Sequence, residues 1–308
     1  MTRAVVFAYH NVGVRCLSVL LAQGVEIPLV VTHTDNPSEN IWFASVAELA
    51  ALHDIPVITP DDPNTPEVIA QIQAAQPDFL FSFYYRNMLK KALLDIPTRG
   101  AFNMHGSLLP KYRGRVPVNW AIIKGETETG STLHVMNEKP DNGALVDSQA
   151  VPILPDDSAL EVFEKVTCAA EIALDRCLPT LLAGTAKLTP QDLSQGGYFG
   201  GRRTEDGRID WWQGAQDIHN LIRAVAPPYP GAFSRLDGKP LKVFRSLLEP
   251  KLAPRTAPPA FYCENGRCYA ACGDGSVLRI LAFELDGAPV DPAAFAAAHA
   301  GKSMTLGD

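Results

Sequence analysis

Short apolar runs alternate with amphipathic stretches over the first 182 residues of the chain. Runs rich in branched and aromatic side chains predict strands at 4–9, 27–32, 56–59, 79–83 and 101–104. Apolar positions three and four apart predict helices at 14–22 and 41–53, and a third that begins at Pro66 with Thr65 as its N-cap. This order predicts an α/β unit with a mainly parallel sheet covered on both faces.

The same unit continues beyond residue 105 with a changed order of elements. A helix is predicted over 118–124, strands over 131–136 and 144–151, and a long helix that is capped by Asp157 or Ser158 and ends near Gly184. We therefore predict a first domain over residues 1–187.

The next stretch, residues 188–203, contains two Gly pairs and little apolar periodicity, which predicts a linker. Residues 204–308 predict a second domain, with a helix over 211–225 followed by several strands. The pairs Asn265-Gly266 and Asp274-Gly275 lie between β-rich runs and indicate hairpins. We expect a small antiparallel barrel or sheet.

Composition narrows the class of protein. The chain of 308 residues is 46% hydrophobic and 20% charged, with a net charge of -7, which is typical of a globular protein and gives no polycationic surface for nucleic acid. It has no signal-peptide core and no apolar run of about eighteen residues, so we expect a cytoplasmic protein with no membrane partner. Its six Cys are scattered, and the spacing of Cys263, Cys268 and Cys272 fits no zinc pattern, so no metal is expected.

Common nucleotide and hydrolase signatures are missing from the chain. The turn after the first predicted strand reads Tyr9-His10-Asn11-Val12-Gly13, which is not G-x-G-x-x-G, and no P-loop is present. Ser107 lies in no G-x-S-x-G sequence. Dinucleotide redox chemistry, phosphate-loop hydrolysis and α/β-hydrolase chemistry therefore have no support.

Asn103 and His105 lie two apart at the carboxyl end of a predicted strand, where open α/β sheets bind ligands. An imidazole that handles an amine proton beside an amide that stabilises an oxyanion suits acyl transfer. The alternative is a structural histidine and a turn-forming Asn. Asp141 lies in a Pro- and Gly-rich turn; it is either a turn residue or a carboxylate that orients His105.

Two further segments are candidates for binding. Lys111, Arg113 and Arg115 put three cations within five residues, which indicates either an anion site or a solvated basic loop. The aromatic run at 81–85 leads into Asn87, Met88 and Leu89, and it forms either core or a slot for a flat heterocycle whose edge is recognised by main-chain groups.

The segment HGSLLPKYRGRVPVNW, followed by PDNGALV, resembles the folate-dependent formyltransferases. Their pattern is Asn-x-His, then Ser-Leu-Leu-Pro, then a distant Asp before Gly. The chain further resembles the formyltransferase half of the bifunctional polymyxin-resistance protein ArnA. The segments that carry this likeness are VVFAYHNVG, THTDNP, FSFYYR and RAVAPPYPGAF. The likeness extends over essentially the whole chain and implies a free-standing enzyme with a Rossmann-like sheet domain and an OB-like barrel.

This resemblance implies roles for particular residues. Asn103, His105 and Asp141 match the catalytic positions. Lys111, Tyr112 and Arg113 are expected at the acceptor. The positions expected to bind the donor, N10-formyltetrahydrofolate, are Asn87, Met88, Leu89, Arg115, Asn137, Glu138, Lys139, Pro140 and Asp141.

The expected acceptor is UDP-4-amino-4-deoxy-L-arabinose, which implies a function in lipid A modification and polymyxin resistance. Alternatives are initiator methionyl-tRNA as acceptor, water as acceptor, and a non-catalytic folate or nucleotide sensor that retains the fold. The sequence leaves the oligomeric state open.

Overall fold

The computed structural model describes residues 2–252, 254–255 and 258–307. The chain divides into two compact units. One comprises Met1–Pro117, Glu128–Pro152 and Glu164–Gly200; the other comprises Val118–Thr127, Ile153–Phe163 and Gly201–Asp308. Among the described residues, no helix combines the length and apolar character needed to cross a membrane.

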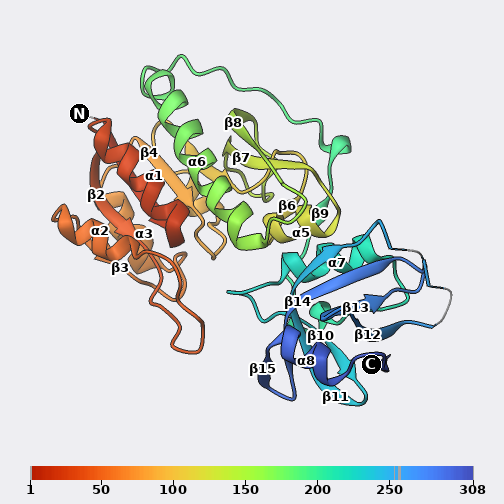
Figure 1. The fold of residues 1–308 in the computed structure, drawn as a ribbon. Coiled ribbons are helices and arrows are strands. Elements are labelled where there is room, and N and C mark those ends of the chain that lie inside the picture. The colour runs from red at the N-terminus through yellow and green to blue at the C-terminus, as the bar shows by residue number, and fades with distance from the viewer. Residues whose placement is uncertain (1, 253, 256–257, 308) are drawn as a thin grey trace. The chain divides into compact units, whose positions relative to one another are not determined.

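The first unit is built on a seven-stranded sheet (Figure 1). In spatial order its strands are β3 (Val57–Ile58), β2 (Glu26–Val31), β1 (Arg3–Ala8), β4 (Phe79–Phe83), β5 (Ala101–His105), β7 (Glu128–Val135) and β8 (Leu145–Pro152). The first five are parallel, whereas β7 is antiparallel to both β5 and β8. The chain order therefore reverses between β1 and β4, the type of position where α/β sheets bind ligands.

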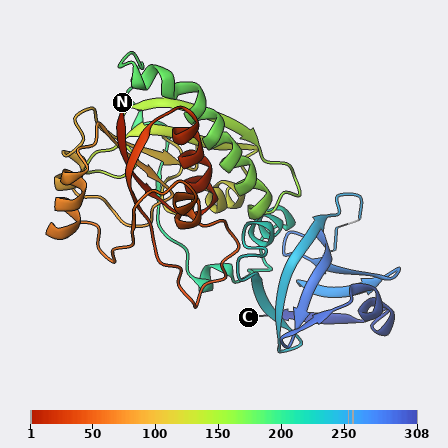
Figure 2. The same cartoon turned by 90° about the vertical axis from the view of Figure 1, so that its left-hand side faces the viewer.

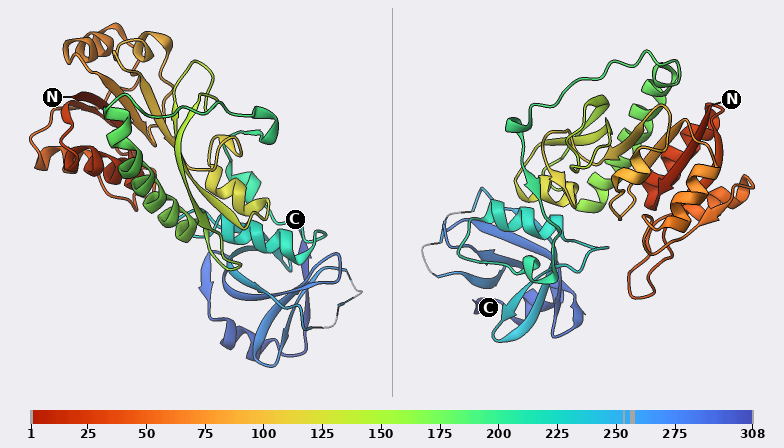
Figure 3. Two further views of the ribbon diagram at one scale, coloured as in Figure 1. Left: turned by 90° about the horizontal axis from the view of Figure 1, so that it is seen from above. Right: turned by 180° about the vertical axis from the view of Figure 1, so that it is seen from behind.

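Helices cover both faces of this sheet, as Figure 3 shows from above. On one face, α1 (His10–Ala22) lies beside α6 (Ala159–Leu182), where Arg15 and Glu171 form an ion pair. The other face packs against α3 (Pro66–Ala74) and α4 (Lys91–Leu94), whose Val68, Ile72 and Leu93 join a core with Val5 and Phe7 of β1. Alternate residues of a buried strand therefore pack against the helices on opposite faces of the sheet, as is typical of a parallel sheet.

Two helices begin at different residues from those predicted. α1 starts four residues early because Gly13 permits close packing: an added Cβ would lie 3.1 Å from the Ala8 Cβ. α2 (Val46–Leu52) starts five residues late, after Ser45, whose hydroxyl accepts a hydrogen bond from the Glu48 amide at 3.2 Å. The aromatic rings of the preceding loop pack on His10 instead of continuing the helical pattern.

The second unit contains a closed six-stranded antiparallel barrel, which Figure 2 shows from another side. Around the barrel its strands are β11 (Lys239–Leu248), β10 (Ala232–Leu236), β16 (Ser303–Gly307), β12 (Ala260–Glu264), β13 (Arg267–Ala271) and β14 (Val277–Leu285). Pairing of β11 with β14 closes the ring, and β15 (Ala288–Val290) adds to β14. The predicted fold class, an α/β domain followed by a small antiparallel barrel, is confirmed.

The second unit also contains the helices α5 (Pro117–Ile123), α7 (Ala215–Ala224) and α8 (Pro292–Ala298), and the first residues of α6. The predicted hairpin at Asn265-Gly266 joins β12 to β13, with both residues at positive φ. Asp274-Gly275 lies in the loop between β13 and β14. The helix predicted from residue 211 begins only at Ala215, because Trp211 is buried and its indole nitrogen donates to Ser234 Oγ at 2.8 Å.

The stretch predicted as a linker has local structure. Tyr198–Phe199 form β9, which pairs in parallel with β6 (Arg113–Gly114) of the first unit. Leu193–Gln195 and Thr204–Gly207 form single 3-10 turns. Residues 188–200 thus belong to the first compact unit and follow it as an extended trace (Figure 3).

Candidate active site

Three side chains predicted to act together lie close to one another in the first unit. Asn103 and His105 are on β5, two residues apart, and Asp141 is in the turn between β7 and β8. The distance from His105 Nδ1 to Asp141 Oδ1 is 3.5 Å. Asn103 approaches the same place through His134, whose Nε2 lies 3.2 Å from Asn103 Nδ2 and 3.5 Å from Asp141 Oδ1. The topology of β5, β7 and β8 creates this cluster.

The Asp141 carboxylate is held from several sides. Its side chain is only 12% exposed, and Oδ2 accepts a hydrogen bond from the Gly114 amide at 2.8 Å. Burial alone would raise the pKa of Asp141, but His105, His134 and the Gly114 amide more than offset it and lower the pKa to about 2. Asp141 is therefore a carboxylate at neutral pH.

His105 is a buried imidazole with a defined tautomer. The residue is 6% exposed, and its Nε2 lies 2.8 Å from the main-chain oxygen of Tyr112, which can only accept. Burial lowers the pKa of His105, and this effect outweighs the opposing influence of Asp141. The ring is thus neutral at pH 7 with its proton on Nε2. Nδ1 keeps its lone pair beside the carboxylate, which would stabilise a proton gained there.

His134 is a site residue that the sequence analysis missed. It is 2% exposed and lies directly opposite Asn103 in the β5–β7 ladder. Its Nδ1 donates to the Val135 carbonyl at 2.9 Å, so Nε2 is free to accept from the Asn103 amide. The only sequence signal was a polar residue within an apolar strand. The significance of this polar residue depends on which strand pairs with β5, and the spacing of residues along the chain does not reveal strand pairing.

The basic segment contributes unequally to the surroundings of the site. Arg113 donates from Nη2 to the carbonyls of Leu193 and Gly196, at 3.3 and 3.1 Å. The Tyr112 ring is buried, and Lys111 and Arg115 are exposed. Of the three residues predicted at the acceptor, Arg113 therefore holds the protein's own backbone and Lys111 is exposed. The Tyr112 ring packs on Phe199 with centroids 5.0 Å apart.

The segment predicted to bind the donor is anchored by a neighbouring loop. Asn64 donates to the Met88 carbonyl at 3.0 Å and accepts from the Lys90 amide at 2.8 Å, and Asn87 Nδ2 donates to the Asp61 carbonyl at 2.9 Å. Leu89 is buried in the core, whereas the Met88 side chain is 56% exposed. These contacts fix the main chain of the segment.

Tyr85, at the start of this segment, has an unsatisfied hydroxyl. Its ring stacks on His33 with centroids 4.2 Å apart. The hydroxyl oxygen is buried without a hydrogen-bond partner among the described residues, and burial raises the pKa of Tyr85 to about 12. Buried polar groups are usually hydrogen-bonded, so this hydroxyl is an exception among the described residues.

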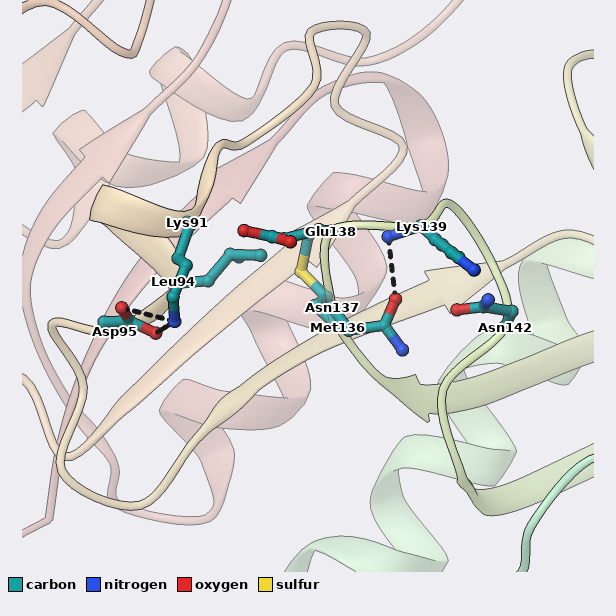
Figure 4. A pocket seen from close by; sticks show the side chains of 8 residues that line it. All are labelled: Lys91, Leu94, Asp95, Met136, Asn137, Glu138, Lys139 and Asn142. Atoms are coloured by element: carbon teal, nitrogen blue, oxygen red, sulfur yellow. Dashed lines mark hydrogen bonds and ion pairs between the residues drawn. The ribbon is translucent and has the colours of Figure 1, made fainter.

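The loop at 137–140 borders a cavity of about 400 Å³, shown in Figure 4. Asn137 closes the loop by accepting a hydrogen bond from the Lys139 amide at 2.9 Å. The cavity is lined by Lys91, Leu94, Asp95, Met136, Asn137, Glu138, Lys139 and Asn142. Asn142 Oδ1 is buried without a partner among the described residues. The predicted donor loop therefore faces a hollow in the size range of small-molecule sites. In the part of the chain that the structure describes, no group of three His, Cys, Asp or Glu could hold a metal ion.

The class of protein is defined by a parallel-rich sheet followed by an antiparallel barrel. In the sheet, an amide and an imidazole at the end of β5 meet a second imidazole from β7 and a carboxylate from the turn after β7. Residues 16–178 match the formyl transferase family, and residues 202–300 match the formyl transferase C-terminal domain. The chain belongs to the formyl transferase family and is an enzyme of that family.

Solved structures show the same fold. The N-formyltransferase from Helicobacter canadensis, in complex with folinic acid and dTDP-3-aminofucose, is 20% identical with a TM-score of 0.71, covering 91% of this chain and 99% of that one. A sugar N-formyltransferase from a Shewanella species is 21% identical, with a TM-score of 0.62 and coverages of 79% and 96%. Phosphoribosylglycinamide formyltransferase from Bacillus halodurans is 26% identical over 59% of this chain and 96% of its own, with a TM-score of 0.52.

Proposed function

We propose that this enzyme transfers a formyl group from N10-formyltetrahydrofolate to the 4-amino group of a UDP-linked amino sugar. The observation that carries the proposal is the convergence of Asn103 and His105 from β5 with Asp141 from the distant turn after β7, at one buried place in a formyl transferase fold. Such an arrangement supplies an oxyanion donor and a proton acceptor on either side of one carbonyl carbon.

The folate supplies the formyl group on N10, so the C–N10 bond breaks as the bond from carbon to the sugar nitrogen forms. Asn103 donates an N–H to the oxygen of the reacting carbonyl, and His134 holds its amide in the required orientation. His105 accepts the proton that the amine loses, at Nδ1, and a proton is returned to N10. Asp141 stabilises the imidazolium during this transfer.

The surroundings of the donor loop fit this substrate. Asn142 Oδ1, which lies in the cavity wall without a hydrogen-bond partner among the described residues, offers an acceptor to a heterocycle. Lys91 and Lys139 lie in the cavity wall, although Lys91 is paired there with Asp95. We propose that the main chain of Asn87, Met88 and Leu89 and the loop at 137–141 hold the folate. Arg115, which is exposed, would contribute from the rim.

For the acceptor we propose UDP-4-amino-4-deoxy-L-arabinose, the substrate class of the polymyxin-resistance formyltransferases. The support is the likeness in KYRGRVPVNW and FSFYYR, together with a structural neighbour that binds a nucleotide-linked amino sugar. In this proposal the exposed Lys111 meets the diphosphate of the nucleotide.

The test is a panel of acceptors with N10-formyltetrahydrofolate: UDP-4-amino-4-deoxy-L-arabinose, dTDP-3-aminofucose, charged initiator tRNA, and buffer alone. We expect formylated UDP-sugar and equimolar tetrahydrofolate. A His105→Ala variant should lose the reaction, and a His53→Ala variant, changed at an exposed histidine, should keep it.

Each other outcome has a definite meaning for the proposal. Formylation of tRNA alone would replace the sugar acceptor, and release of tetrahydrofolate in buffer alone would identify a hydrolase. Folate binding without release in any reaction would identify a sensor.

A further inference from the structure

We propose that Gln191, from the segment that follows α6, is a positioning residue for Asp141. The inference rests on the proposed function only for the catalytic role of Asp141. Gln191 Nε2 donates to the main-chain oxygen of Asp141 at 3.1 Å and to that of Gly143 at 2.6 Å. One amide group therefore joins the two ends of the turn that presents the carboxylate.

The approach of Gln191 is fixed by pairing two residues earlier. Thr189 and Leu145 exchange both main-chain hydrogen bonds, at 2.8 and 2.9 Å, in an antiparallel bridge at the start of β8. From there the segment runs antiparallel to the chain at 141–145, so residue 191 faces the Asp141 turn. The segment thus acts as an added edge to the sheet beside the site.

The same segment also aims the hydrogen bond that the carboxylate receives. The amides of Arg113 and Arg115 donate to the carbonyls of Gly197 and Phe199, at 3.0 and 2.9 Å. Because successive N–H groups of an extended strand point to opposite sides, the Gly114 amide between them points away from this partner and donates to Asp141 Oδ2. Gln191 thus holds Asp141 at its main chain, and the pairing of β9 with β6 supports its carboxylate through Gly114.

This support is required by the backbone of the turn. Asp141 has φ +56°, in the left-handed region that is costly for a residue with a Cβ. Gly143 is squeezed against β7, where an added Cβ would lie 1.9 Å from the Val135 carbonyl oxygen. A donor that bridges the carbonyls of residues 141 and 143 holds the turn closed. A carboxylate at position 191 would lack the donor hydrogens and repel Asp141.

The charged and titratable groups facing Asp141 are His105 from β5 and His134 from β7. The pKa values of Asp141 and His105 therefore depend on where the Asp141 carboxylate lies. The test compares Gln191→Ala and Gln191→Glu with the wild-type chain. Gln195→Ala is the matched control, because Gln195 is an exposed glutamine of the same segment whose side chain donates to Ser194 Oγ at 3.5 Å and not to the Asp141 turn. Carboxyl and imidazole NMR titrations measure the pKa values of Asp141 and His105, and steady-state kinetics measures kcat and KM.

In Gln191→Ala, we expect the pKa of Asp141 to rise from about 2 toward the ordinary value of an aspartate. We expect kcat to fall about tenfold to a hundredfold, with a smaller change in the acceptor KM, because displacement of a catalytic group mainly affects turnover. Gln191→Glu, which keeps the volume of the side chain, should raise the pKa of Asp141 further. Gln195→Ala should match wild type in all three quantities.

A wild-type pKa of Asp141 in both Gln191 variants would overturn the proposal, as would an equal effect of Gln195→Ala. The NMR arm needs no turnover. If the wild-type chain formylates no amino sugar, the proposed function fails while the titrations still decide the role of Gln191.

Discussion

Asn103 and His134 lie directly opposite each other on antiparallel neighbours, β5 and β7, and their side-chain nitrogens are 3.2 Å apart. Since His134 uses Nδ1 to donate to its adjacent carbonyl, Nε2 accepts from one amide hydrogen of Asn103. This contact with His134 fixes the orientation of the Asn103 amide group and therefore the direction of its second N–H hydrogen. The oxyanion donor that we propose is therefore oriented by a histidine outside the family motif.

Removal of the Asn103 amide should abolish turnover more than binding. Loss of one oxyanion donor typically costs on the order of a hundredfold to a thousandfold in rate, so we expect such a decrease in kcat for Asn103→Ala. Calorimetric binding of folinic acid should change little. Asn40→Ala, at an exposed loop position, is the control. Wild-type turnover of Asn103→Ala would remove Asn103 from the mechanism.

The effects of Asn103 and His134 should not be additive. His134→Ala is expected to lower kcat by about tenfold to a hundredfold, because the Asn103 amide loses its orientation. If His134 acts through Asn103, the double variant should be no slower than Asn103→Ala alone. The measurement is kcat for the four chains of the cycle. Additive losses would show that His134 acts independently.

The pH dependence of turnover should follow His105. Burial lowers its pKa, so the neutral, proton-accepting ring persists below the ordinary histidine range and activity falls only in more acidic solution. Asp141 raises the pKa of His105; Asp141→Asn should therefore shift the acidic limb of the kcat profile to lower pH while reducing the maximal rate.

The control for this shift is Asp54→Asn, a second aspartate at positive φ but on the exposed surface. Its profile should superimpose on that of the wild-type chain. An acidic limb that moves to higher pH in Asp141→Asn would contradict the assignment.

Acid should destabilise the fold through buried histidines. Burial, with the nearby Arg86 charge, lowers the pKa of His10 to about 3 and that of His33 to about 4. The unfolded chain takes up protons near pH 6.5 while the native chain does not, so stability falls as pH decreases from about 6.5 toward 4. The slope from His10 is about 1.4 kcal/mol per pH unit.

His10→Asn tests this, since Asn tolerates the positive φ of +65° at that position. Chemical denaturation at several pH values should show a smaller slope for His10→Asn than for wild type. The exposed His53→Asn variant should keep the wild-type slope. An unchanged slope in His10→Asn would refute the assignment.

Gly143 should tolerate no side chain. An added Cβ would lie 1.9 Å from the Val135 carbonyl oxygen, and main chain cannot yield as a flexible side chain can. We expect Gly143→Ala to cost on the order of 1–3 kcal/mol and to displace Asp141, so that thermal stability and kcat both fall. Gly200→Ala, where no atom lies within 4 Å of an added Cβ, should change neither. Full activity of Gly143→Ala would show that the turn is adaptable.

Local patterns predicted most elements of the fold. The strand at 79–83, the Thr65 cap with Pro66, and the Asn265-Gly266 hairpin each follow from residues adjacent in the sequence. Predictions were wrong at 41–45, where periodicity suggested helix but the aromatic rings pack on His10. Tertiary contacts overrode the local preference there.

The sequence by itself determined the class of fold and predicted Asn103, His105 and Asp141 as site residues, because strand alternation and a short motif are local properties. Only the tertiary structure decided that β7 lies beside β5, which brings His134 to Asn103, and that Gln191 contacts the Asp141 turn while β9 pairs with β6. The contacts of Asn103 with His134 and of Asp141 with Gln191 join residues 31 and 50 positions apart in the chain. Strand pairing brings these residues together, and periodicity along the chain does not predict which strands pair.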